Sequence, residues 1–159
     1  MSTPASENEL QTIRYYYRYD ATLASAGQPE ASQLELLPGA FDCVVNLARP
    51  DSPHALTDEA GALKSLGLPY IHLPVDFKHP LARDMDNFLA MMREPTVQRR
   101  FVHCAYNWRA SSFVFLHRII NSGCDPQQAT ADLHAIWHPD ATWQTFIETT
   151  LQRYDLKPE

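Results

Sequence analysis

The sequence is poor in glycine, in cysteine and in long hydrophobic stretches. Among 159 residues there are five glycines and three cysteines, which are Cys43, Cys104 and Cys124. Their spacing matches neither a zinc site nor a disulfide framework, so a hydrophobic core must stabilise the domain. No stretch reaches the length of a transmembrane helix. The polar, acidic start, MSTPASENE, lacks the basic and apolar regions of a signal peptide. We expect residues 1–9 to be a disordered tail and the protein to act in the cytoplasm, where thiols stay reduced.

An excess of positive charge is also absent. Thirteen Lys and Arg face nineteen Asp and Glu, which gives a formal net charge of −6. This balance argues against a nucleic acid or an anionic membrane as the main partner. The length suits one domain with a sizeable core. No repeat or linker interrupts it, so we predict a single domain over residues 10–159.

Strand and helix signals alternate along the chain. Runs of β-branched, aromatic or apolar residues predict strands at 13–19, 22–26, 41–47, 69–75 and 101–103. Amphipathic spacing and capping residues predict helices at 29–37, 57–67, 80–93, 109–123, 125–136 and 141–154, with Thr57 as an N-cap. This alternation is typical of βαβ units. We therefore predict an α/β fold with a central, parallel-rich sheet of about four or five strands and helices on both faces.

The segment RRFVHCAYNWRASS contains the residues with the clearest chemistry. Cys104 ends an apolar strand and faces the start of the next helix. The unpaired amides and the dipole at a helix N-terminus stabilise a thiolate, which is the nucleophilic form. The same amides can bind an oxyanion, and Arg109 can add two parallel hydrogen bonds. One short segment can thus supply a nucleophile and a phosphate-binding loop.

His103, Cys104, the short loop, Arg109 and Ser111 resemble the signature of the cysteine-dependent protein tyrosine and dual-specificity phosphatases. The stretch SAGQP at 25–29 similarly resembles bacterial dual-specificity relatives. The resemblance implies a phosphomonoester hydrolase that works through a cysteinyl-phosphate, without cofactor or metal. Its partner would be a phosphorylated protein or small molecule.

The loop departs from that signature in length. Four residues separate Cys104 from Arg109, where the family usually has five. Counted from the cysteine, Ser111 keeps the family position and Ala110 replaces the arginine; counted from the arginine, the loop has lost a residue. One residue on a helix turns a side chain by about 100°, so the direction of Arg109 is open. The loop also lacks glycine, so Asn107 or a neighbour would have to take any left-handed conformation.

The resemblance also implies roles for the residues around Cys104, the nucleophile. His103 would orient the loop, and Ser111 or, less well, Ser112 would donate to the thiolate. Asp76, 28 residues before Cys104, occupies the place of the family's general acid, with Asp84 and Asp86 as weaker alternatives. The phosphate oxygens would be held by the Arg109 guanidinium and the backbone amides of Ala105, Tyr106, Asn107, Trp108 and Arg109.

Other interpretations remain open. Cys104 could be an inert core thiol, and Asp76 an ordinary loop or capping carboxylate. The four-residue loop also resembles that of rhodanese-type sulfurtransferases, and the altered loop could instead serve a non-catalytic phosphate- or phosphopeptide-binding module. His134 and His138 are spaced for a metal, but this pair lacks further ligands and Pro139 follows it. We therefore predict no metal site.

Overall fold

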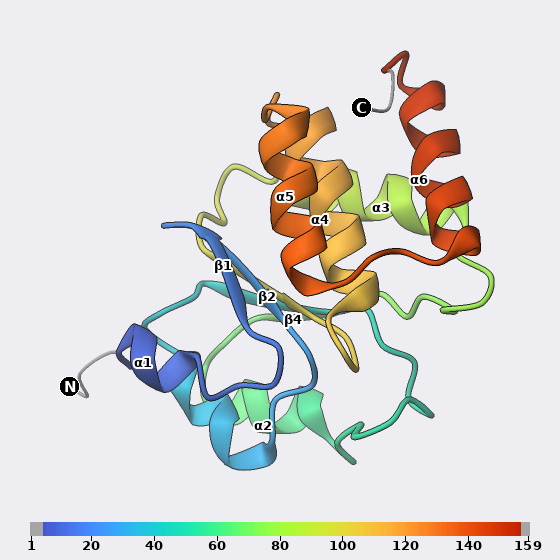
Figure 1. Cartoon of the computed structure of the whole chain (residues 1–159). Coiled ribbons are helices and arrows are strands. Elements are labelled where there is room, and N and C mark those ends of the chain that lie inside the picture. The colour runs from blue at the N-terminus through green and yellow to red at the C-terminus, as the bar shows by residue number, and fades with distance from the viewer. Residues whose placement is uncertain (1–4, 157–159) are drawn as a thin grey trace.

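The computed structural model of the chain describes residues 5–156 (Figure 1). Its strands are β1 (Tyr17–Asp20), β2 (Leu23–Ala26), β3 (Cys43–Asn46), β4 (Tyr70–His72) and β5 (Arg100–His103). Its helices are α1 (Glu7–Leu10), the 3₁₀ helix η1 (Ala31–Leu36), α2 (Glu59–Ser65), α3 (Ala82–Met92), α4 (Trp108–Ile120), α5 (Pro126–Ile136) and α6 (Ala141–Arg153).

The five strands form one sheet in the order β1-β2-β5-β3-β4. Only β1 and β2 pair antiparallel, and all other neighbours are parallel. The prediction of a parallel-rich sheet of four or five strands is therefore confirmed. His103, at the end of β5, pairs with Ala26 on one side and with Asn46 on the other. The carboxyl ends of the three central strands thus meet at one edge, where ligands bind in folds of this type.

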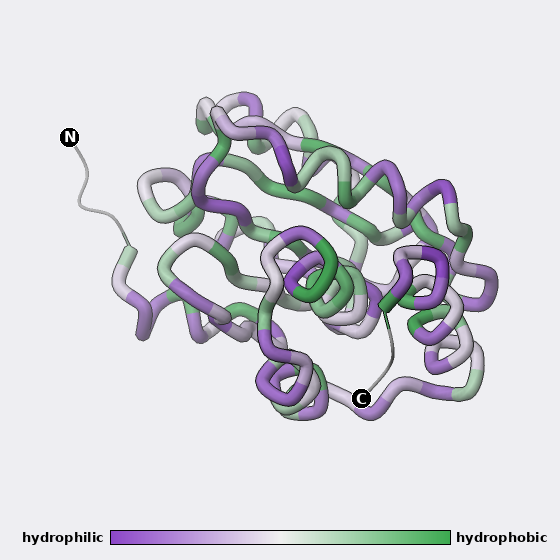
Figure 2. Tube along the Cα trace, turned by 90° about the horizontal axis from the view of Figure 1, so that it is seen from above, coloured by the Kyte–Doolittle hydropathy of each residue, from purple (hydrophilic) through white to green (hydrophobic). Residues whose placement is uncertain are grey.

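Helices cover both faces of the sheet, as predicted. In Figure 1, α3 to α6 lie on one face, and α1, η1 and α2 lie on the other. Successive strand residues point to opposite faces. Phe101 packs with the core beneath α1 and α2, whereas Val102 packs with the core beneath α3 to α6. The central strands are accordingly largely buried, and hydrophobic stretches run through the interior of the tube in Figure 2.

Two expectations about the start of the chain differ from the structure. Glu7 to Glu9, assigned to the tail, belong to α1, which Ser6 caps by accepting from the Glu9 amide. Met1 to Pro4 lie outside the described residues. The first strand begins at Tyr17 and not at Ile13, because Tyr15 takes a left-handed conformation with φ of 53°. Ile13 is buried below that turn.

The structure also corrects the start of the second helical segment. Asp58, and not Thr57, is the N-cap of α2, and its carboxylate accepts from the Gly61 amide at 3.0 Å. The segment after Pro29 forms the 3₁₀ helix η1 in place of an α-helix. The predicted helices at 80–93, 109–123, 125–136 and 141–154 all occur, as α3, α4, α5 and α6, and their ends differ from the predicted ones by at most three residues.

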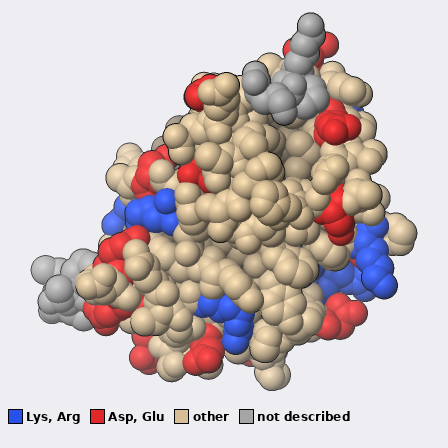
Figure 3. Space-filling model, viewed as in Figure 1, with Lys and Arg blue, Asp and Glu red and all other residues tan. Residues whose placement is uncertain are grey.

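Within residues 5–156 no helix is long and apolar enough to cross a bilayer. On the face seen in Figure 3, Lys and Arg form separate patches with Asp and Glu around them. An anionic ligand must therefore be attracted by local groups, since the net charge is negative.

Candidate active site

Cys104 lies where β5 ends, beside the first turn of α4. Its amide donates to the Ala26 carbonyl at 3.3 Å, which continues the pairing with β2. The Ala110 amide lies 3.5 Å from Sγ and is directed at it. The thiol is therefore buried against the N-terminal end of a 13-residue helix.

Asn107 occupies the left-handed conformation predicted for the glycine-free loop, with φ of 68° and ψ of 4°. Asparagine tolerates this region better than most residues. Its Nδ2 donates to the Tyr15 carbonyl at 2.8 Å, which ties the loop to the turn before β1. Its Oδ1 is buried without a hydrogen-bond partner among the described residues. The loop thus closes with one residue fewer, at a local cost in backbone conformation.

Cys104 and Arg109 line one cavity of about 210 Å³, together with Pro53, Phe77, Ala105, Tyr106 and Trp108. Arg109 is buried, and its Nη1 donates to the Val75 carbonyl at 2.9 Å. Arg109 therefore still lines the cavity that contains Cys104, although the loop is shortened. Of the two ways to align the loop, the one that counts from the arginine agrees with this geometry.

His103 forms a buried pair with a residue that the sequence did not single out. Its Nε2 lies 2.6 Å from Oε2 of Glu59, and Oε1 of Glu59 accepts from Gln28 at 2.7 Å. Burial raises the pKa of Glu59, but the hydrogen bond and charge of His103 outweigh burial and lower it overall. Glu59 lies in the first turn of α2. Its partner is 44 residues away, so no local pattern could reveal the pair.

The SAGQP stretch contacts the back of the cysteine loop. Gln28 donates its amide to the Ala105 carbonyl at 3.0 Å, and Gly27 forms an isolated bridge with Tyr106. A Cβ at Gly27 would lie 2.6 Å from the Ala105 oxygen, which is too close for any side chain. The glycine is therefore required by the close approach of two backbone segments.

Asp76 follows β4 on the loop beside the cavity but does not line it. Its Oδ1 accepts from the Lys78 amide at 2.9 Å, and its Oδ2 lies 3.3 Å from Nη1 of Arg49. The Lys78 amide is the main reason that the pKa of Asp76 is lowered, and the Arg49 charge adds to it. Asp76 is nevertheless one residue from Val75, whose carbonyl Arg109 holds.

The two weaker candidates lie in α3. Asp86 is bound by Arg153 and by the Tyr154 hydroxyl, on the side of α3 that meets α6. Burial raises the pKa of Asp84, and no hydrogen bond to its side chain occurs within residues 5–156. Neither carboxylate lines the cavity that contains Cys104.

The serines after Arg109 do not contact the thiol. Ser111 Oγ donates to the Trp108 carbonyl at 3.2 Å, and Ser112 Oγ donates to the same carbonyl at 2.8 Å. Serine hydroxyls inside helices often bond back to the preceding turn in this way. The hydrogen bond expected from Ser111 to Cys104 is thus replaced by the Ala110 amide.

Aromatic side chains form the wall of the cavity. Trp108 stacks on Trp137 with a centroid distance of 5.3 Å, and Phe77 contacts both rings. The ring centroids of Tyr106 and Trp108 are 5.5 Å apart. Trp108 is 39% exposed, so its ring is available to a bound ligand while its other face is held by Trp137.

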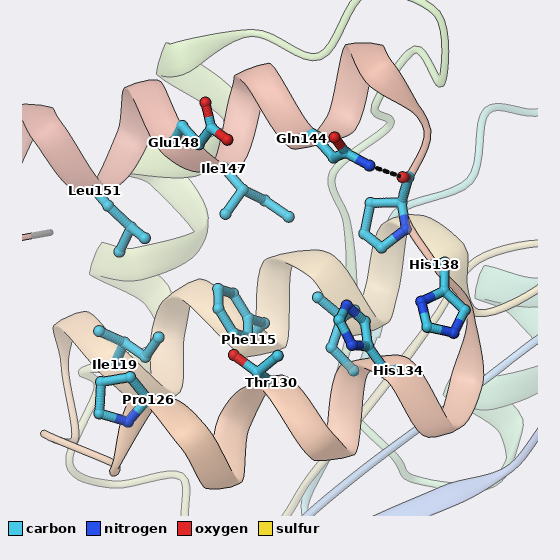
Figure 4. A pocket seen from close by; sticks show the side chains of 12 residues that line it. Phe115, Ile119, Pro126, Thr130, His134, His138, Gln144, Ile147, Glu148 and Leu151 are labelled. Carbon is cyan, nitrogen blue, oxygen red and sulfur yellow. Dashed lines mark hydrogen bonds between the residues drawn. The ribbon is translucent and has the colours of Figure 1, made fainter. Parts of the chain in front are cut away.

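His134 and His138 lie on a different cavity, between α4, α5 and α6 (Figure 4). Their ring centroids are 4.4 Å apart. In the described part of the chain no group of three or more His, Cys, Asp or Glu is placed to hold a metal ion. The rest of this cavity is largely apolar, with Phe115, Ile119 and Leu151 among its lining residues.

Comparison with known proteins places these features among phosphatases. No protein-family model and no curated protein matches the chain. A DUF442 protein of Shewanella putrefaciens CN-32, described as a candidate phosphatase, is 31% identical, with a TM-score of 0.83 over 94% of this chain and 99% of its own. The core catalytic domain of the yeast (S. cerevisiae) PP-IP phosphatase SIW14 is 14% identical, with a TM-score of 0.71 over 86% and 85%. TpbA of P. aeruginosa is 20% identical, with a TM-score of 0.67 over 92% and 88%. The last two share the fold.

Proposed function

From the premise that this chain belongs to the DUF442 family, within the superfamily of cysteine-dependent tyrosine and dual-specificity phosphatases, we propose that it hydrolyses phosphomonoesters through a cysteinyl-phosphate. One observation carries the proposal: Cys104 and Arg109 line the same cavity at the N-terminus of α4. A nucleophile and anion donors at one point are what phosphoryl transfer requires.

The proposed reaction has two steps. The Cys104 thiolate attacks phosphorus, an S–P bond forms, and the P–O bond to the leaving group breaks. Water then attacks phosphorus, the S–P bond breaks, and inorganic phosphate and the thiolate are released. The Ala110 amide, 3.5 Å from Sγ, supports the thiolate at the start and end of this cycle.

The loop amides and Arg109 are proposed to hold the equatorial oxygens of the phosphoryl group. Such fixed donors stabilise charge that spreads over these oxygens in the transition state. The supporting contacts lie behind the loop: Glu59 fixes the His103 imidazole, and Gln28 holds the Ala105 carbonyl. These contacts orient the loop without touching the ligand.

Asp76 is proposed to protonate the leaving oxygen. Its position next to Val75 supports this role, because the Val75 carbonyl accepts from Arg109 at 2.9 Å. Its lowered pKa makes the protonated form scarce at neutral pH. Protonation matters most for poor leaving groups. Asp76→Asn should therefore slow the hydrolysis of alkyl phosphates more than that of an activated aryl phosphate, in steady-state kinetics at pH 6. An equal effect on both substrates would mean that Asp76 is an ordinary loop carboxylate, and Asp84 would become the candidate general acid.

The substrate is proposed to be a phosphorylated protein side chain or small molecule, acted on in the cytoplasm. The aromatic wall formed by Tyr106, Trp108 and Phe77 supports a preference for an aromatic or otherwise planar leaving group. A reducing compartment would keep Cys104 in the thiol state.

The decisive experiment combines turnover with thiol labelling. Wild-type protein should hydrolyse an aryl phosphate, and Cys104→Ser should lose on the order of 10⁴-fold or more of that rate. Cys124→Ser is the matched control and should keep it. Iodoacetamide should label Cys104 fastest, and vanadate should protect it. Persulfide formation from thiosulfate, without vanadate protection, would favour a sulfurtransferase. Vanadate protection without turnover would favour a phosphate-binding module.

A further inference from the structure

A second polar cavity lies at the opposite edge of the sheet, where β5 begins and α4 ends. Its volume is about 230 Å³, and its lining includes Asp20, Thr22, Arg100, His117, Arg118 and Ser122. β5 and α4 both run from this cavity to the cysteine loop. At 1.5 Å per residue, the stretch of α4 from Arg109, at the cysteine cavity, to His117, at the second cavity, spans about 12 Å. No part of the proposed reaction uses this second cavity.

The guanidinium of Arg100 has only part of its hydrogen-bonding capacity satisfied within residues 5–156. One terminal nitrogen, Nη2, donates to the Glu94 carbonyl at 2.7 Å. Within residues 5–156 no carboxylate forms an ion pair with it. The side chain is partly buried, and burial lowers its pKa from the ordinary value, although an arginine remains charged. A partly desolvated charge without a counter-charge favours an anionic ligand.

The hydrogen bonds around His117 determine which of its two ring nitrogens carries the proton. Arg93 can only donate, so the oxygen of Asn121 accepts from it at 3.0 Å. The amide nitrogen of Asn121 must then donate, and it lies 2.9 Å from Nδ1 of His117. Nδ1 is therefore the acceptor, and the neutral ring carries its proton on Nε2. His117 is 8% exposed, and within the described residues its Nε2 has no hydrogen-bond partner.

The neutral form of His117 agrees with its surroundings. Burial, followed by the charges of Arg100 and Arg118, lowers its pKa to about 4, while Asp20 opposes the shift. Arg118 is neutralised by Asp132. Asp20 also lines the cavity, and its Oδ1 accepts from the amide and the hydroxyl of Thr22. Arg100 thus remains the positive charge of the cavity that has no ion pair within residues 5–156, and its charge is close enough to lower the pKa of His117, which lines the same cavity.

We propose that this cavity binds a small oxyanion, either inorganic phosphate or sulfate or the phosphate group of a small metabolite, through the Arg100 guanidinium and the Nε2–H of His117. The volume admits one tetrahedral anion with its nearest water molecules, or the head of a small phosphate ester. The proposal does not depend on the phosphatase activity, because none of these residues lies at the cysteine loop.

Nuclear magnetic resonance of the full chain tests the proposal because it separates the two sites. Potassium sulfate, with potassium chloride at equal ionic strength as the reference, should shift the His117 ring and the Arg100 side-chain resonances along a saturating curve. The same titration with inorganic phosphate and with glycerol phosphate distinguishes a free anion from a phosphate ester. Shifts confined to residues 104–109 would overturn the proposal, as would linear shifts equal to those with chloride.

Matched variants identify the donors. Arg100→Gln should weaken sulfate binding at His117 about tenfold or more, because a charged hydrogen bond is lost. Arg83→Gln, at an exposed arginine of α3, should leave it unchanged. His117→Gln can replace the donor with an amide nitrogen and should retain part of the affinity at Arg100. If Arg100→Gln does not fold, Arg100→Lys provides the comparison and should bind more weakly than wild type. Unchanged affinity in every folded variant would refute the site.

Discussion

The two ends of the β5–α4 unit offer anions different kinds of donors. At the cysteine end the candidate donors are mostly backbone amides of residues 105–110, with one arginine. At the far end they are side chains, those of Arg100 and His117. A backbone donor is positioned by the fold itself, whereas a side-chain donor is positioned by its own neighbours. Point substitutions can therefore remove the far site, but they can alter the near site only through Arg109 or through the contacts that shape the loop.

The supporting contacts follow the same division. The cysteine loop is held from behind by backbone or buried groups, through Gln28, Gly27 and Glu59. The far cavity depends on a chain of side-chain amides and rings that begins at Arg93 and passes through Asn121 to His117. Chemistry that needs sub-ångström placement benefits from the first arrangement, while the second suffices for binding.

The largest effect should come from the single side-chain donor at the cysteine end. Arg109→Lys removes the planar pair of donors and leaves one point charge. We expect kcat for an aryl phosphate to fall about 10²–10³-fold, as for loss of a transition-state donor. Arg83→Lys is the control for a change of arginine to lysine elsewhere. A loss below about threefold, measured at saturating substrate, would mean that the amides alone hold the phosphoryl group.

Glu59→Gln should weaken the support behind the loop in a pH-dependent way. The folded-state pKa of Glu59 is lowered, so its charge stabilises the fold at pH above its ordinary value, and this contribution is lost as the pH falls through the folded value. Urea unfolding should show a loss of about 1–3 kcal/mol at pH 7 that shrinks toward pH 3. Glu148→Gln, at an exposed position of α6, is the control. A loss that is constant with pH would assign the effect to packing.

The smallest effect should come from the strained residue of the loop. Asn107→Ala loses the bond to the Tyr15 carbonyl and puts alanine, which tolerates a positive φ less well than asparagine, at this position, so it should lower the stability by about 2 kcal/mol. Asn107→Gly loses only this hydrogen bond and should lower the stability by about 1 kcal/mol. Part of this loss is offset because glycine adopts a positive φ without strain. Thermal unfolding of both variants compares them directly. Equal losses would show that the conformation at Asn107 carries no cost.

Local patterns accounted for most of the fold because strands, caps and helix stops leave signals within a few residues. The start of α5 lies within one residue of the predicted position, and the missing glycine correctly pointed to Asn107. The geometry of the candidate site was harder to predict from the sequence. The direction of the Arg109 side chain depends on how the short loop closes. The Ser111 hydroxyl donates to the Trp108 carbonyl in the preceding helical turn, and not to the thiol.

Glu59 illustrates the limit most clearly. A first-turn acid of a helix is ordinarily explained by the helix dipole. Its burial and its bond to His103 arise only when η1, α2 and β5 come together, and they involve Gln28 as a third member. Positions that act through long-range pairs in this way cannot be recognised from neighbours in sequence.

The placement of the tryptophans gives the protein its own optical reporter. The chain has three, Trp108, Trp137 and Trp143, and the centroids of all three rings lie within 6 Å of the Phe77 ring centroid. Phe77 and Trp108 line the cavity that contains Cys104. Intrinsic fluorescence therefore originates from one side of the molecule. A ligand that enters the cysteine cavity should quench or shift this emission, whereas sulfate at Arg100 should leave it nearly constant. Emission and the His117 resonances, recorded in one titration, would assign each anion to its end of the protein without any added label.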